Sequence, residues 1–176
     1  FGMQLEAGKP GFEWVAHSIY PVLIKNKDLR IWIGNAQCGQ PYHASILNIG
    51  AMSYGALSKT AIQAVNEGAA LGGFALNTGE GGISPYHLHG GDLIWQVGTG
   101  YFGCRKADGN FDPELFRMNA TRPSVKMIEL KLSQGAKPGH GGILPAIKNS
   151  PEIAKIRNVA PGTAVLSPSG HTAFRN

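Results

Sequence analysis

Short runs of apolar residues, separated by polar loops rich in glycine, dominate the chain. The run at residues 45–49 ends before a glycine and is typical of a buried strand. Ser58 is then a suitable N-cap for a helix over residues 59–71, in which apolar side chains recur at helical spacing until two glycines end the pattern. A second apolar run, at residues 74–76, completes the order strand, helix, strand, which predicts a parallel sheet.

The clearest strand covers residues 125–132, whose alternate side chains must face opposite sides of a sheet. Met127, Glu129 and Lys131 share one face. A lysine that points inward at the carboxyl end of a buried strand is costly unless it meets an anion or an electron-rich ring. Lys131 is therefore a candidate site residue. The alternatives are a surface lysine whose ammonium group reaches solvent, or an ion pair with Glu129.

The remaining segments give weaker signals. A short helix is expected near residues 113–119, inside an irregular excursion at residues 83–122 that the pattern does not otherwise assign. A serine, a proline and an acid at residues 150–152 predict the first turn of a helix that ends near Asn158. The apolar run at residues 163–166 is too short to assign.

Composition narrows the class of protein. The 16 Lys and Arg against 11 Asp and Glu leave a formal charge of +5, and 43% of the residues are hydrophobic, which indicates a globular domain or a part of one. No run approaches the roughly 18 apolar residues that a membrane span needs. No cluster of like charges predicts a nucleic-acid surface. We therefore expect no nucleic-acid partner and no membrane segment within this chain.

Cysteine and histidine spacing argues against a metal site. Cys38 and Cys104 are far apart in the sequence and are expected to be two buried, inert thiols in a reducing, cytoplasmic setting. His87 and His89 form an HxH pair without a third ligand at suitable spacing, so both are expected to be ordinary loop residues. The nucleophile elbow of the hydrolases is also absent from the sequence.

Three glycine-rich loops, at residues 50–56, 77–82 and 133–142, each follow an apolar strand. The carboxyl ends of parallel strands lie on one side of a sheet, so we expect these loops to meet where α/β folds build their sites. Glycine there lets backbone N–H groups approach a planar ring or an anion. None of the loops matches the dinucleotide or P-loop motifs. Glu80 is a candidate for hydrogen bonding or proton relay, the alternative being a solvated loop acid.

Three segments stand in order along the chain, at residues 50–58 (GAMSYGALS), 77–82 (NTGEGG) and 131–139 (KLSQGAKPG). Together with residues 98–105 (GTGYFGCR), they resemble the FMN-binding synthase domain of the glutamate synthases. The likeness runs from about Cys38 to the end of the chain. Two further segments, at residues 11–14 (GFEW) and 17–19 (HSI), are similar to the lead-in of the shorter, stand-alone members of that family.

The resemblance implies an α/β fold, a (β/α)8 TIM barrel that binds FMN at the carboxyl ends of its strands. It also implies the conversion of 2-oxoglutarate and ammonia to L-glutamate with reduced flavin. Glu80 and Lys131 would then be catalytic, Glu80 in proton chemistry and Lys131 at the electron-rich edge of the ring. The residues that match the FMN-binding positions are Ala51, Met52, Ser53, Thr78, Gly79 and Lys131, and those that match the 2-oxoglutarate positions are Gln134, Lys137 and Arg157.

Some features of the family are changed or missing in this chain. His140 stands where the large enzymes have a glutamate, which changes the charge of the site and bears on the identity of the substrate. No segment corresponds to the amidotransferase domain that releases ammonia from glutamine. The iron–sulfur cysteines of the family would fall beyond Asn176, so a cluster is an option only outside this chain. An electron-donor protein or a reductase subunit is the partner that the resemblance implies.

The length of the chain limits how much of the barrel it holds. A complete barrel typically needs about 250 residues, and residues 46–176 hold three to four of its eight β/α units. We therefore expect residues 46–176 to be the N-terminal part of the barrel, and residues 1–45 to be an irregular lead-in with one short strand at residues 31–33. The open sheet would expose an edge strand, and the isolated chain is expected to bind FMN weakly or not at all.

Two other functions fit the same residues. One is a non-catalytic barrel module that binds an anion or a partner through these loops. The other is a different FMN-dependent barrel oxidoreductase, such as a hydroxy-acid oxidase, which would need a histidine base late in the barrel. Replacing Lys131 with alanine separates the enzyme from the binding module, because only the enzyme would lose turnover.

Overall fold

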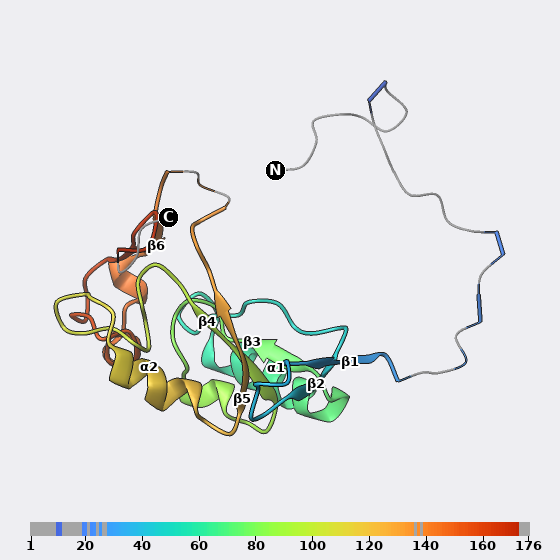
Figure 1. Cartoon of the computed structure of the whole chain (residues 1–176). Coiled ribbons are helices and arrows are strands. Elements are labelled where there is room, and N and C mark those ends of the chain that lie inside the picture. The colour runs from blue at the N-terminus through green and yellow to red at the C-terminus, as the bar shows by residue number, and fades with distance from the viewer. Residues whose placement is uncertain are drawn as a thin grey trace.

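The structure is a computed structural model that describes residues 10–11, 19–20, 22–23, 25, 28–135, 137 and 139–172. Its centre is a parallel sheet of three strands in the order β3 (Ala75–Asn77), β4 (Asp92–Val97) and β5 (Val125–Leu130). Ile49 adds a parallel bridge to Leu76 beside β3. The described residues therefore form a mixed α/β fold with a parallel sheet, as expected from the sequence, and the arrangement is compatible with part of a barrel (Figure 1).

Two helices pack against one face of this sheet. The first, α1 (Lys59–Gly72), is capped by the hydroxyl of Ser58, which confirms the helix expected from the sequence. The second, α2 (Pro113–Ala120), confirms the short helix expected near residue 113. Leu93 of β4 packs in a cluster with residues of α1, and Trp95 packs with residues of α2. The odd-numbered residues of β4 therefore face the helices, and the even-numbered residues face the other side.

Strand β4 was not expected, because it lies inside the excursion at residues 83–122 that the sequence pattern left unassigned. It is nevertheless the middle strand of the parallel sheet. A short 3-10 helix, η1 (Pro85–His87), precedes it in place of the crossover α-helix that usually signals a following strand. The six-residue run from Asp92 to Val97 is bordered by glycines on both sides, so its extent was available in the sequence, but its partners were not.

The expected strand at residues 45–49 is wrong. Strand β2 (Tyr42–Ser45) ends at its first residue, and Ile46 and Leu47 are 60% and 65% exposed. The side chain of Asn48 explains the change of direction, because it donates to the carbonyl of Ser45 and accepts from the N–H of Ala75. Those two bonds turn the chain, so that within 45–49 the bridge at Ile49 alone reaches the parallel sheet.

The described part of the lead-in is more regular than expected. Strand β1 (Arg30–Ile33) confirms the short strand expected at residues 31–33, and it pairs with β2 in an antiparallel sheet. Cys38, in the turn between them, is exposed, so the expectation of two buried thiols holds for Cys104 and is wrong for Cys38. The segments GFEW and HSI, at residues 11–14 and 17–19, fall mostly outside the described residues.

The C-terminal part forms a second antiparallel pair. Strand β6 (Gly142–Leu144) pairs with β7 (Val165–Ser167), which covers the run that was too short to assign from the sequence. Between them lie a 3-10 helix, η2 (Ala146–Lys148), and α3 (Pro151–Arg157), whose serine cap and N1 proline are as expected. Leu144, Ile153 and Val165 pack on Phe102, which fixes this unit beside the loop that follows β4.

No helix in the described ranges is long and apolar enough to cross a membrane.

Candidate functional site

The loops after the parallel strands lie at one edge of the sheet, as expected. Strand register places Glu129 of β5 opposite Gln96 of β4, on the side away from the helices. Lys131, two residues further along, follows the same alternation, and its N–H donates to the carbonyl of Val97 at 2.9 Å. Lys131 therefore points to the side of the sheet that α1 and α2 do not cover.

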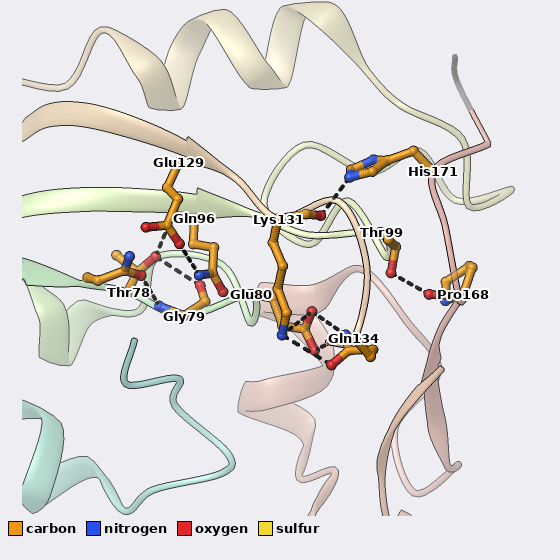
Figure 2. A network of polar contacts seen from close by, with 11 residues as sticks. Thr78, Gly79, Glu80, Gln96, Thr99, Glu129, Lys131, Gln134, Pro168 and His171 are labelled. Carbon is orange, nitrogen blue, oxygen red and sulfur yellow. Dashed lines mark hydrogen bonds and ion pairs between the residues drawn. The ribbon is translucent and has the colours of Figure 1, made fainter. Parts of the chain in front are cut away.

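Lys131, Glu80 and Gln134 form a closed polar network at this edge (Figure 2). The Lys131 ammonium lies 3.3 Å from a carboxylate oxygen of Glu80 and 3.1 Å from the side-chain carbonyl of Gln134. The amide nitrogen of Gln134 donates to both oxygens of Glu80, at 3.0 and 2.8 Å. The side chains of Lys131 and Glu80 are 30% and 19% exposed to solvent, so a ligand can reach them.

The alternative ion pair between Lys131 and Glu129 is wrong. Glu129 accepts a hydrogen bond from the side-chain amide of Gln96, one layer deeper in the sheet (Figure 2). The backbone N–H of Gln96 donates to the hydroxyl of Thr78, which itself donates to the carbonyl of Gly79. The Thr78 hydroxyl is thus occupied within the sheet, and contact with a ligand would have to come from its backbone.

A cavity of about 190 Å³ opens beside the network. Two cationic residues line it in addition to the acid: Lys137, which is exposed, and Arg157, which is 5% exposed. The lining consists of Ser53, Ala56, Glu80, Gln134, Lys137, Gly142, Ile143, Leu144, Arg157, Val165 and Ser167. Larger cavities occur elsewhere, such as one of about 340 Å³ between β2 and β5, but its lining contains none of the candidate residues. The 190 Å³ cavity is therefore the better candidate site.

Arg157 comes from the last turn of α3 and lies beneath two of the glycine-rich loops. Its guanidinium donates to the carbonyl of Tyr54 at 3.2 Å and lies 5.0 Å from the centre of the Phe102 ring. The Nε atom is buried and has no hydrogen-bond partner among the described residues. Burial lowers the pKa of Arg157, and the negative charge of Glu80 acts against this effect. A buried donor without a partner is unfavourable, so the position suits an anionic ligand.

A pair of tyrosines ties the first loop to α3. The hydroxyls of Tyr54 and Tyr86 donate to the two carboxylate oxygens of Glu152, at 2.6 and 2.9 Å. Burial, followed by the hydrogen bond to Glu152, raises the pKa of Tyr54, so the phenol stays protonated at neutral pH. These bonds hold α3 against the loop, and thereby fix the position from which Arg157 reaches the cavity.

A segment after β7 covers the ends of β4 and β5. The hydroxyl of Thr99 donates to the carbonyl of Pro168 at 2.6 Å, and Nε2 of His171 lies 2.7 Å from the carbonyl of Lys131 (Figure 2). Since a carbonyl can only accept, that histidine nitrogen carries the proton. The bond restrains the backbone from which the Lys131 side chain extends.

The structure brings most of the sequence-predicted site residues together. Glu80, Gln134 and Lys137 line the cavity with Ser53 and Arg157, and Lys131 contacts two of them. The other four do not line the cavity: Met52 is half-buried, Thr78 and Gly79 are buried, and Ala51 is exposed.

Sequence reasoning missed one residue that contacts these loops. His87, expected to be an ordinary loop residue, is fully buried and bonds the carbonyl of Met52. Its proximity to Ser84 at helical spacing was visible in the sequence, but its contact with a loop 35 residues away was not. In the described ranges, no group of three or more His, Cys, Asp or Glu could hold a metal ion.

Comparisons with known proteins agree in pointing to one family. The family profile described as "Conserved region in glutamate synthase" matches residues 24–176. Over 159 residues, the chain is 43% identical to the glutamate synthase large subunit-like protein YerD of Bacillus subtilis (strain 168), which covers 89% of this chain and 30% of that protein. It is 34% identical over 165 residues to an archaeal glutamate synthase (NADPH) of Methanocaldococcus jannaschii, covering 91% of this chain and 28% of the relative.

A third relative is the glutamate synthase large subunit-like protein of Rhizobium meliloti (strain 1021), which is 33% identical over 146 residues. The match covers 82% of this chain and 30% of that relative. The chain thus spans less than a third of the length of these curated relatives.

Proposed function

Because the chain belongs to the glutamate synthase family, we propose that it forms part of the flavin-binding barrel of a glutamate synthase-type oxidoreductase. The proposed reaction is the FMN-dependent reductive amination of 2-oxoglutarate by ammonia, which yields L-glutamate. One observation carries the proposal: Glu80, Lys131 and Gln134 meet at the carboxyl edge of a parallel sheet, beside a cavity with two more cationic residues.

The charges around the cavity suit a dicarboxylate substrate. 2-Oxoglutarate carries two negative charges, and two cationic residues line the cavity: Lys137 from the third glycine-rich loop and Arg157 from the last turn of α3. Arginine can hold a carboxylate through two parallel hydrogen bonds, and the Nε atom of Arg157 has no hydrogen-bond partner among the described residues. Gln134 would orient the substrate, because its amide already spans the distance between Glu80 and Lys131.

The residues present also fit the ring of FMN. A Cβ atom at Gly79 would lie 2.8 Å from the backbone nitrogen of Ser53, so glycine lets these two loops pack in direct contact beside the proposed ring site. Lys131 would stand near the electron-rich edge of the ring, where a cation stabilises negative charge. Reduced FMN, when bound, would supply the hydride for the reduction. We assign no phosphate-binding residue, because barrels usually place that site after their last two strands.

The side chains of this chain would manage charge and protons. Glu80, held by Gln134 and Lys131, would move a proton to or from the nitrogen of the substrate. The Lys131 ammonium would attract the ring and the carboxylate of Glu80 at once. Arg157 and Lys137 would fix the two ends of the substrate, which reduces its freedom before reaction.

The remaining assignments extend the proposal beyond this chain. We propose that the parallel sheet belongs to a (β/α)8 barrel, with residues 46–176 as its N-terminal part. Electrons would come from an electron-donor protein or a reductase subunit, and an iron–sulfur cluster would lie beyond Asn176. The names of several relatives include NADPH, which makes a pyridine nucleotide a reasonable ultimate donor. The cytoplasmic location remains a prediction from the sequence.

The experiment uses the product of the complete reading frame that encodes this chain. Glutamate formation is measured from 2-oxoglutarate and ammonia with chemically reduced FMN. We expect Lys131→Ala to lower the rate at least about 100-fold, as removal of a well-placed charged group commonly does. Lys126→Ala is the matched control, because Lys126 lies on the same strand and pairs with Asp92 at 3.7 Å, away from the site. A Lys131→Ala variant that keeps full activity, or a wild type that binds FMN without forming glutamate, would favour the binding module.

A further inference from the structure

His87 is a buried histidine whose ring orientation is fixed by hydrogen bonds on both nitrogens. It is 0% exposed, its Nε2 lies 2.9 Å from the carbonyl oxygen of Met52, and its Nδ1 accepts the backbone N–H of Ser84 at 3.1 Å. Because Nδ1 accepts that N–H, the ring proton of the neutral form is on Nε2, which donates it to Met52. Burial lowers the pKa of His87, against the opposing effect of its bonds to the backbone of Met52 and Thr78, so the neutral form prevails at pH 7.

The hydrogen bond from His87 helps to fix the backbone at Met52, in the first glycine-rich loop. The N–H of Met52 donates to the carbonyl of Asn77 at 3.0 Å, and the carbonyl of Met52 is held by His87. In a planar trans peptide, the carbonyl and the following N–H point in opposite directions. The N–H of Ser53 must therefore point away from His87.

The Ser53 nitrogen lies close to Gly79. A Cβ atom at Gly79 would lie 2.8 Å from this nitrogen, so glycine leaves space there that any other residue would fill. Ser53 also lines the cavity beside Glu80. Within the described part of the chain, the Ser53 N–H donates to no protein acceptor. A rigidly held donor of this kind is suited to a ligand acceptor.

We infer that His87 is a positioning residue, which holds the Met52–Ser53 peptide so that the Ser53 N–H is presented to a hydrogen-bond acceptor of the bound flavin ring. The inference rests on the proposed function and adds to it a residue outside the cavity. Burying a histidine is unfavourable unless both of its ring nitrogens find hydrogen-bond partners. Here Nε2 bonds the carbonyl of Met52, and Nδ1 is held by the backbone N–H and the hydroxyl of Ser84.

Two variants separate the donor from the rest of the side chain. Glutamine carries an amide nitrogen at about the reach of Nε2, so His87→Gln keeps a donor for Met52. The shorter side chain of asparagine can reach Ser84 but not the carbonyl of Met52. His87→Asn therefore loses the donor to Met52. In the product of the complete reading frame, we expect His87→Asn to bind FMN about tenfold more weakly, as the loss of one hydrogen bond predicts, and to shift the visible absorption of the bound flavin. His87→Gln should stay within about twofold of wild type.

Asn66→Ala is the control for a purely structural effect. Asn66 is also 0% exposed, and its side chain accepts from the N–H groups of His89 and Gly91, at 2.8 and 3.1 Å. This variant should lower the melting temperature and leave the spectrum and affinity of bound FMN unchanged. The inference is overturned if His87→Asn has wild-type affinity and spectrum, if Asn66→Ala changes them equally, or if His87→Gln does not fold. A wild type that binds no FMN would instead defeat the proposed function.

Discussion

Gly79→Ala tests whether the close approach of two loops at the site is as tight as the structure indicates. Gly79 has φ of +65°, a conformation that costs an L-residue about 1–2 kcal/mol. The new methyl group would also lie 2.8 Å from the nitrogen and 2.9 Å from the Cβ of Ser53. Relief requires the loops to separate, at a cost of about 1–3 kcal/mol. The two effects together should lower the free energy of unfolding by about 2–5 kcal/mol. This is a large part of the about 5–15 kcal/mol by which folded proteins are usually stable.

Urea unfolding measures this loss directly. Trp95 is 0% exposed, so its fluorescence reports the opening of the core. With a slope of about 2 kcal/mol per molar urea, the midpoint should drop by about 1–2.5 M. Gly50→Ala is the matched control, because a Cβ there would meet no described atom within 4 Å and its φ is not positive. It should change the free energy of unfolding by less than about 0.5 kcal/mol. Equal midpoints for the two variants would refute the reasoning.

Two further predictions concern groups outside the site. Burial, with the charge of Asp112, raises the pKa of Cys104 to about 12, whereas Cys38 is exposed. Iodoacetamide labelling of the native protein should therefore modify Cys38 and spare Cys104 until unfolding, and peptide mapping that finds both labelled equally fast would contradict this. Burial and the bond to Asp92 raise the pKa of Tyr42 to about 12, above its ordinary value of 10.0. The stabilisation by its protonated form is thus complete below pH 10 and is lost as the pH rises through about 12. Urea unfolding should show a smaller alkaline loss in Tyr42→Phe, and an unchanged pH dependence would exclude this role.

Local signals made part of the fold and site predictable. The cap at Ser58 and the glycines after α1 act through neighbouring residues, so the helix could be located from the sequence alone. The alternation along β5 predicted the direction of Lys131, because that direction depends on the strand itself. The glycine-rich loops predicted the carboxyl edge as the place where Glu80 and Gln134 meet.

The errors arose where distant contacts decide the outcome. Ile46 and Leu47 are apolar enough for a strand, but the side chain of Asn48 bonds Ala75 and turns the chain. An ion pair between Glu129 and Lys131 was one alternative that the sequence left open, yet the register between β4 and β5, which shifts between Leu93 and Ile94, pairs Glu129 with Gln96. The burial of His87 likewise depends on the first loop folding back over η1.

The binding of 2-oxoglutarate by the FMN-loaded product of the complete reading frame tests the central claim most directly. The claim is that Lys137 and Arg157 hold a dicarboxylate in the cavity beside Glu80. Titration with 2-oxoglutarate, followed by the visible absorption of the flavin, should give a saturable change in the wild type. The same change should require at least about tenfold more 2-oxoglutarate in Lys137→Ala, as the loss of a charged contact predicts. No spectral change in the wild type, or identical titrations of the two proteins, would contradict the account.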